Sequence, residues 1–216
     1  MSLNKKNMMA VAAVALAAGS AFAAPVTASY TSFGTLSAAT FGGSGISNDA
    51  VAVTSLSGAT LGLSATPRYN SPALSNNGAG VFQAQAGAYG SGDNMALWNY
   101  DYYIGGGLTA LQYSYKLLVD FNPAAGNDQS TYTDMSYLLL AGAQNSQNLG
   151  FNTGYLQFDP TQNGEYGVVL AAFKNGREVG RSAILVDVGD VPEPASYALV
   201  GAALAGAAFA ARRRKV

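Results

Sequence analysis

The middle of the chain, residues 24–190, consists of short runs in which apolar and polar residues alternate, with no helical period of useful length between them. Alternation of this kind places every second side chain on the same face of a β-strand. Candidate strands lie at residues 50–54, 60–64, 94–104, 108–121, 131–141, 149–158, 165–173 and 178–188. The pattern therefore predicts an all-β domain with many short strands.

Two glycine-containing turns indicate β-hairpins. Gly105, Gly106 and Gly107 join residues 94–104 to 108–121, and glycine supplies the positive φ angles of a tight reversal. Asn175 and Gly176 join residues 165–173 to 178–188, and Asn-Gly is the strongest short signal for a two-residue hairpin. We expect both strand pairs to be antiparallel neighbours in an antiparallel β-sandwich, of jelly-roll or immunoglobulin-like form.

The second of these hairpins resembles the last two strands of fibronectin-type and immunoglobulin-like sandwiches. The resemblance rests on residues 159–166, on the Asn-Gly turn and on the apolar residues 184–186. It implies that Tyr166 takes the place of the corner tyrosine in those folds.

The first 23 residues have the three parts of a secretory signal peptide. Lys5 and Lys6 form a positive segment, residues 8–18 are apolar, and Ala21 and Ala23 fit the A-x-A pattern of a cleavage site. We expect signal peptidase to cut after Ala23, so that residues 24–190 form a single exported domain.

The last 26 residues combine three features that act together. Pro192, Glu193 and Pro194 form an extended segment, because proline removes backbone donors and disfavours a helix through Glu193. Residues 195–211 carry no charge and as a helix would span roughly 26 Å, near the lower limit for crossing a bilayer. The basic residues that follow should stay in the cytoplasm and stop transfer; these are Arg212, Arg213, Arg214 and Lys215.

This order of Pro-Glu-Pro, apolar helix and arginine cluster resembles the PEP-CTERM sorting signal of exported Gram-negative bacterial proteins. The resemblance implies that an exosortase, a multi-pass membrane enzyme, cuts near the Pro-Glu-Pro at residues 192–194. A permanent C-terminal anchor and an alanine-rich core helix are the alternatives. Four cationic residues at the end of the helix argue against the core helix.

Residues 24–194 contain five basic and twelve acidic residues, which gives a net charge of −7. Such a charge repels phosphate backbones, so we expect no nucleic-acid partner. The chain has no Cys and no His, which excludes disulfides, Ser-His-Asp and Cys-His catalysis, and zinc sites built on those residues. We therefore expect a protein that is not an enzyme and has no cofactor.

Two groups of residues are candidate binding sites. Oxygen ligands for Ca²⁺ could come from Asp120, Asn122, Asn127 and Asp128, although these side chains also suit turns in which they bond their own backbone. An aromatic stripe could stack on sugar rings or instead pack across strands, with Tyr113 and Tyr115 expected on the partner strand; it consists of Trp98, Tyr100 and Tyr102.

These observations predict an exported, non-catalytic protein of the cell surface or biofilm matrix. We expect an inner-membrane-anchored precursor that signal peptidase and exosortase process, with the membrane as a transient partner. The alternative is a carbohydrate-binding module that contacts exopolysaccharide. A third hypothesis is a glycosidase that uses a pair of carboxylates, although no spacing selects a pair from Asp101, Asp120, Asp134 and Glu178.

Overall fold

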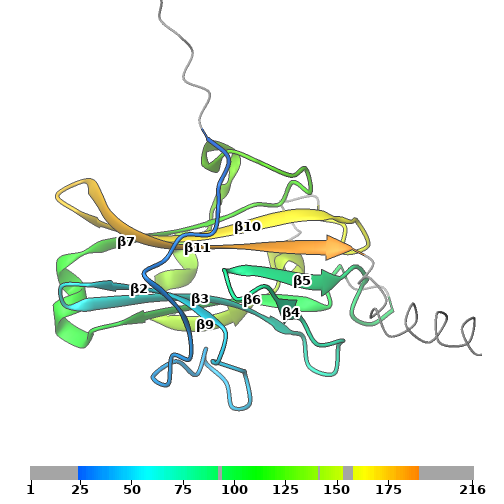
Figure 1. Cartoon of the computed structure of the whole chain (residues 1–216), viewed down its shortest axis with the longest axis horizontal. Helices are drawn as coiled ribbons and strands as arrows, with labels where there is room; N and C mark the ends of the chain where they lie inside the picture. The colour runs from blue at the N-terminus through cyan, green and yellow to red at the C-terminus, as the bar shows by residue number, and fades with distance from the viewer. Residues whose placement is uncertain (1–23, 92–93, 141, 153–157, 190–216) are drawn as a thin grey trace, which may run out of the picture.

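The computed structural model describes residues 24–91, 94–140, 142–152 and 158–189 (Figure 1). The expected signal peptide and the sorting tail, with its expected transmembrane helix, lie outside these residues. Within the described part of the chain, no helix is long and apolar enough to cross a membrane.

The described residues form two β-sheets, which confirms the all-β prediction. The first sheet has the order β1 (Ser32–Gly34), β2 (Val51–Leu56), β3 (Ala59–Pro67), β6 (Trp98–Gly105) and β9 (Gln144–Gln147). The second has the order β4 (Ser75–Asn76), β5 (Val81–Gln85), β11 (Arg177–Gly189), β10 (Gly164–Lys174), β7 (Ser114–Val119) and β8 (Thr133–Asp134). Four short 3₁₀ helices connect strands in this part of the chain; they are η1 (Gly107–Gln112), η2 (Gln129–Thr131), η3 (Ser136–Leu140) and η4 (Leu149–Asn152).

The two sheets stack as layers, and their facing side chains form the main hydrophobic core (Figure 1). From the first sheet the core takes Leu61, Leu63 and the aromatic residues of β6. From the second it takes alternate residues of β10 and β11, such as Val168 and Ile184. Burial of this apolar surface is the main driving force for the fold.

Strands β10 and β11 lie at the centre of the second sheet and are buried on both faces. Val169 and Ala183 face away from the main core and pack under Val26 and Tyr132. This second cover explains why β10 reads as a continuous apolar run rather than an alternating one. A Cβ atom on Gly167 would lie 1.9 Å from the Tyr132 hydroxyl oxygen, so the close approach requires glycine there.

The hairpin predicted at Asn175 and Gly176 is confirmed. Strands β10 and β11 pair in antiparallel register, and both turn residues have positive φ angles, 54° and 75°. The hydroxyl of Tyr166 donates to the carbonyl oxygen of Gln162 at 3.3 Å, four residues upstream. This is the hydrogen bond of a tyrosine corner.

The hairpin predicted at Gly105, Gly106 and Gly107 is wrong. Strand β6 pairs with β3 and β9 in the first sheet, whereas β7 pairs with β10 and β8 in the second. Helix η1 carries the chain from one sheet to the other. A Cβ atom on Gly106 would lie 2.3 Å from the Gly58 carbonyl oxygen. Gly106 therefore allows a close backbone approach at a crossing between sheets.

Three further expectations need correction. Residues 131–141 contain only the two-residue strand β8 before helix η3, and residues 149–158 begin with helix η4 instead of a strand, with 153–157 outside the described residues. The sandwich is also not wholly antiparallel, because β5 runs parallel to β11. The first two errors have one cause, because short apolar runs such as those at residues 131–141 and 149–158 do not by themselves distinguish a strand from a short helix.

Candidate functional site

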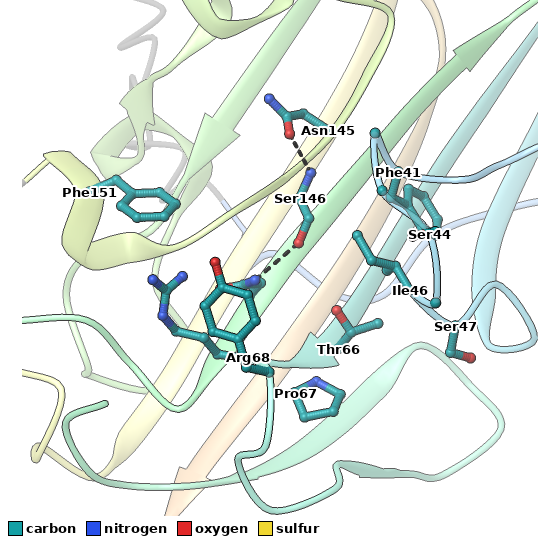
Figure 2. A pocket seen from close by; sticks show the side chains of 15 residues that line it. Phe41, Ser44, Ile46, Ser47, Thr66, Pro67, Arg68, Asn145, Ser146 and Phe151 are labelled. Carbon is teal, nitrogen blue, oxygen red and sulfur yellow. Dashed lines mark hydrogen bonds between the residues drawn. The ribbon is translucent and has the colours of Figure 1, made fainter. Parts of the chain in front are cut away.

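A cavity of about 480 Å³ opens on the outer face of the first sheet, away from the main core (Figure 2). One wall is the loop at residues 41–47, and the other is formed by the ends of β3, β6 and β9 with helix η4. The described residues that line it are Phe41, Gly42, Gly43, Ser44, Gly45, Ile46, Ser47, Thr66, Pro67, Arg68, Tyr69, Asn99, Asn145, Ser146 and Phe151.

The loop wall is anchored by its backbone and by its own small core. The side-chain oxygen of Gln144 on β9 accepts hydrogen bonds from the backbone N–H groups of Thr40 and Phe41, both at 2.9 Å. Phe41 is fully buried with Ala39, Val51 and Val53. The loop is thus fixed to the sheet on the N-terminal side of its glycine-rich part.

The floor of the cavity is polar because every second residue of β6 faces away from the core. Asn99 donates from its amide nitrogen to the Ser146 hydroxyl at 3.1 Å. Buried Asn148 donates to the Asn99 side-chain oxygen at 2.8 Å and to the Trp98 carbonyl at 2.7 Å. It also accepts from the Gly150 backbone N–H at 3.0 Å, which ties η4 to the sheet.

Asp101 is a fully buried carboxyl group beside this floor. The Thr66 hydroxyl donates to one of its oxygens at 2.8 Å, and its other oxygen is buried without a hydrogen bond of good geometry from the described residues. Burial raises the pKa of Asp101 to about 7, although the nearby hydroxyls of Ser146 and Thr66 counteract part of that rise. The carboxyl group therefore titrates near neutral pH.

Arg68 provides the positive charge of the cavity. Its guanidinium carbon lies 4.9 Å from the ring centre of Tyr69, 5.1 Å from that of Tyr89 and 5.0 Å from that of Phe151. Distances below about 6 Å are those of cation–π contacts. The side chain is 7 % exposed, and its Nε atom is buried without an acceptor among the described residues.

Two residues of the lining have strained backbone. Phe41 and Tyr69 both have a φ angle of 48°, in the left-handed region that costs a side-chain-bearing residue about 1–2 kcal/mol. Asn175, the third such residue in the described chain, lies in a hairpin turn where this conformation is usual. Strain of this kind is typical of ligand sites.

The sequence-predicted glycan stripe does not form a surface. Trp98, Tyr100 and Tyr102 point into the core between the sheets and are at most 1 % exposed. Tyr113 and Tyr115 contact one another near η1 and do not face the stripe across a strand pair. The prediction that these residues contact glycans is therefore wrong, and the alternative that Trp98, Tyr100 and Tyr102 pack in the core is confirmed.

The residues proposed for Ca²⁺ mostly form turns. Asp120 accepts from the Asn122 backbone N–H at 2.9 Å and from the Asn127 amide at 2.8 Å, while Asp128 accepts from the Ser130 backbone N–H at 2.7 Å. Hydrogen bonds with Ser130 lower the pKa of Asp128, and burial raises the pKa of Asp120. Asp120, Asn122 and Asn127 lie together, but no described cluster of three acidic residues suits a metal ion.

The carboxylates considered for glycoside cleavage are spread over the molecule. Asp101 lies on β6, Asp134 pairs with Lys116 at 3.7 Å beside β7, and Glu178 pairs with Arg181 on β11. Asp120 is held in its turn after β7. None of the four lines either of the two cavities described by their residues, the one at Arg68 and the one at Phe33 and Phe82.

Sequence reasoning missed the cavity and its central residue. A usable signal was present, since Arg68 is the only basic residue between residues 24 and 115. The aromatic residues that surround it come from three separate segments. Their convergence could not be read from spacing along the chain.

Comparison with known proteins identifies the C-terminal segment. Residues 190–215 match the family model of the PEP-CTERM protein-sorting motif. The match includes Pro192, Glu193 and Pro194 and the basic residues up to Lys215, all outside the described residues. Neither a curated protein nor a solved structure matches the chain. The motif indicates export and processing by an exosortase.

Proposed function

Because the chain ends in a PEP-CTERM sorting motif, we propose that the β-sandwich is the mature part of a non-catalytic protein of the cell surface or biofilm matrix. The observation that carries the proposal is the position of the motif. It begins at residue 190, directly after the last residue of β11, Gly189. Removal of the tail would therefore leave every described strand of both sheets intact.

The proposal also uses the predicted signal peptide at the other end of the chain. Signal peptidase would release the N-terminus, and the tail would hold the precursor in the inner membrane until exosortase acts. Lys5, Lys6 and the four terminal basic residues would then stay on the cytoplasmic side. The processed domain would be acidic, which favours solubility outside the cell.

Expression of the full chain with and without a cognate exosortase tests this delivery. We expect a shorter C-terminus and surface or extracellular location only when exosortase is present, as measured by intact mass and fractionation. A variant with Pro192→Ala and Pro194→Ala should remain as the membrane-bound precursor. Arg177→Gln, a change at an exposed position far from the motif, is the matched control and should be processed normally.

An intact C-terminus in both strains would contradict the sorting proposal. Normal processing of the double proline variant would show that the motif is not what the enzyme reads. The first result would leave a permanent anchor as the better interpretation, and the second would show only that exosortase recognises another feature of the tail.

Carbohydrate binding is the second candidate function, and the cavity at Arg68 favours it. The cavity combines aromatic rings with amide and hydroxyl groups, which is a common composition of small-ligand sites. A glycan array probed with the processed protein separates the two roles. Selective binding supports a carbohydrate-binding module, and uniform lack of binding supports a purely structural role.

A further inference from the structure

The guanidinium group of Arg68 is nearly buried and forms no ion pair with the described residues. Both ion pairs in the described part of the chain involve other cations, Lys116 and Arg181. The Nε atom of Arg68 is shielded from solvent without an acceptor there. A buried charged donor left unpaired is costly, and native structures rarely keep one without a reason.

The aromatic cage compensates for only part of this cost. The rings of Tyr69, Tyr89 and Phe151 lie within 5.1 Å of the guanidinium carbon. They attract the cation through their π faces but offer no acceptor to its in-plane N–H groups. What the described site lacks is therefore an acceptor for the Nε–H group of Arg68.

The rest of the cavity is neutral. Among the described residues that line it, Arg68 alone carries a formal charge, although the exported part of the chain is acidic as a whole. Two carboxyl groups adjoin the lining, since Asp49 accepts from the Ser47 hydroxyl and buried Asp101 accepts from the Thr66 hydroxyl. Charges farther away are screened beyond about 8–10 Å at physiological ionic strength. An anion can thus be attracted to the Arg68 end of the cavity, where the described lining carries its positive charge.

The ligand should be larger than a single carboxylate. Figure 2 shows Arg68 and Phe151 at one end of the cavity, with Ser44 and Ile46 toward the other. Tyr69 and Phe151 are 74 % and 47 % exposed, so their rings offer apolar surface at the rim. Asn145 and Ser146 add amide and hydroxyl groups between the two ends.

We propose that this cavity binds an acidic sugar residue, with the planar carboxylate of the sugar on Arg68 and the ring against Tyr69 and Phe151. The guanidinium fork matches a carboxylate in a two-bond arrangement, which a lysine cannot reproduce. The proposal rests on the carbohydrate-binding role proposed above and assigns it a site and a ligand class.

Calorimetric titration of the full chain, purified in detergent, tests the proposal with two ligands that differ in charge. Trigalacturonate is compared with its methyl ester, in which the carboxylates are neutral. We expect the ester to bind at least tenfold more weakly, because charge-assisted hydrogen bonds to Arg68 are lost. Acetate at equal carboxylate concentration should also bind at least tenfold more weakly than the acid trimer, since it leaves the ring contacts unmade.

Three variants test whether Arg68 and Tyr69 cause these differences in affinity. Arg68→Gln should remove the preference for the acid over the ester, and Arg68→Lys should keep only part of it. Tyr69→Asn should weaken both ligands while the preference remains, because asparagine tolerates the left-handed backbone and lacks the ring. Arg177→Gln is the matched control, since Arg177 is exposed beside the turn between β10 and β11, and it should bind like the unaltered chain.

Equal binding of acid and ester by the unaltered chain would overturn the proposal, and so would a lack of binding by both. An affinity for acetate equal to that for the trimer would overturn the sugar assignment. These comparisons use the unaltered chain and hold even if Arg68→Gln does not fold. Correct exosortase processing without acid binding would refute this site alone, whereas acid binding without processing would refute only the delivery proposal.

Discussion

The two faces of strand β6 show how one strand can build two different environments. One face carries Trp98, Tyr100 and Tyr102 into the dry core between the sheets. The other face carries Asn99 into the lining of the cavity on the outer side of the first sheet, and buried Asp101 bonds to Thr66 of that lining. The large aromatic residues of β6 therefore stabilise the core, whereas its polar residues contribute to the candidate site around Arg68. Four predictions test this division, beginning with the largest effect.

Replacement of Trp98 by alanine should destabilise the protein by about 3–5 kcal/mol, because it removes a fully buried aromatic side chain and leaves a cavity. Chemical denaturation measured by fluorescence of the tyrosines or by circular dichroism gives the free energy of unfolding. A loss below about 1 kcal/mol would mean that the stripe is not core. That result would reopen the surface interpretation.

Asp101 lies on the other face of β6 and should make the stability of the fold depend on pH. Its pKa is about 7 in the folded state against an ordinary value of 3.8, so between these values the folded protein holds a proton that the unfolded chain has lost. Stability should therefore fall as pH rises from about 4 to 7, by at most about 4 kcal/mol.

The change Asp101→Asn should flatten this part of the pH profile. Denaturation midpoints at several pH values measure the effect, and Asp49→Asn is a control at an exposed carboxylate. A profile that stays as steep in Asp101→Asn would show that another group causes it.

Asn148 hydrogen-bonds to the Trp98 carbonyl and to the Asn99 side chain, and its replacement by alanine should lower the free energy of unfolding by roughly 3 kcal/mol. The variant removes a buried side-chain oxygen that accepts from the Ala96 backbone N–H and a buried amide that donates to the Trp98 carbonyl. The unfolding free energy measures the loss. The variant Asn145→Ala, at a partly buried position on the cavity rim, should lose less than about 1 kcal/mol.

Tyr69→Asn should have the smallest effect on stability, a loss of no more than about 1 kcal/mol, which is the size of one cation–π contact with Arg68. The side chain is 74 % exposed, and asparagine accepts the left-handed backbone angle more readily than tyrosine. Thermal unfolding checks this expectation. A loss comparable with that of Trp98→Ala would place Tyr69 in the structural framework and remove the contrast between the two faces.

Local signals predicted the parts of the fold that depend on neighbours along the chain. The Asn175-Gly176 hairpin was found because its turn chemistry is specific, and the pairing of β10 with β11 follows from it. The glycines at residues 105–107 gave an equally clear signal for a reversal, yet the chain there passes between sheets. A turn signal shows that the chain changes direction, but it does not show which strand becomes the partner.

The candidate site was predicted less well for a related reason. Alternation along β6 correctly separated its residues into two sets, but it did not indicate which set faces the core. Arg68 had no motif around it, and the rings that enclose it come from Tyr69, Tyr89 and Phe151. Contacts between such distant residues depend on sheet stacking and loop placement.

The sequence by itself determined the C-terminal sorting motif of the protein and its all-β class. A sorting motif is recognised as a short linear segment, so residues 190–215 are sufficient to identify it. The tertiary structure alone decided that the aromatic stripe is core and that the buried Nε of Arg68 lacks an acceptor among the described residues around its cavity. Burial and pairing depend on which faces meet in space, and the stacking of the two sheets sets those contacts.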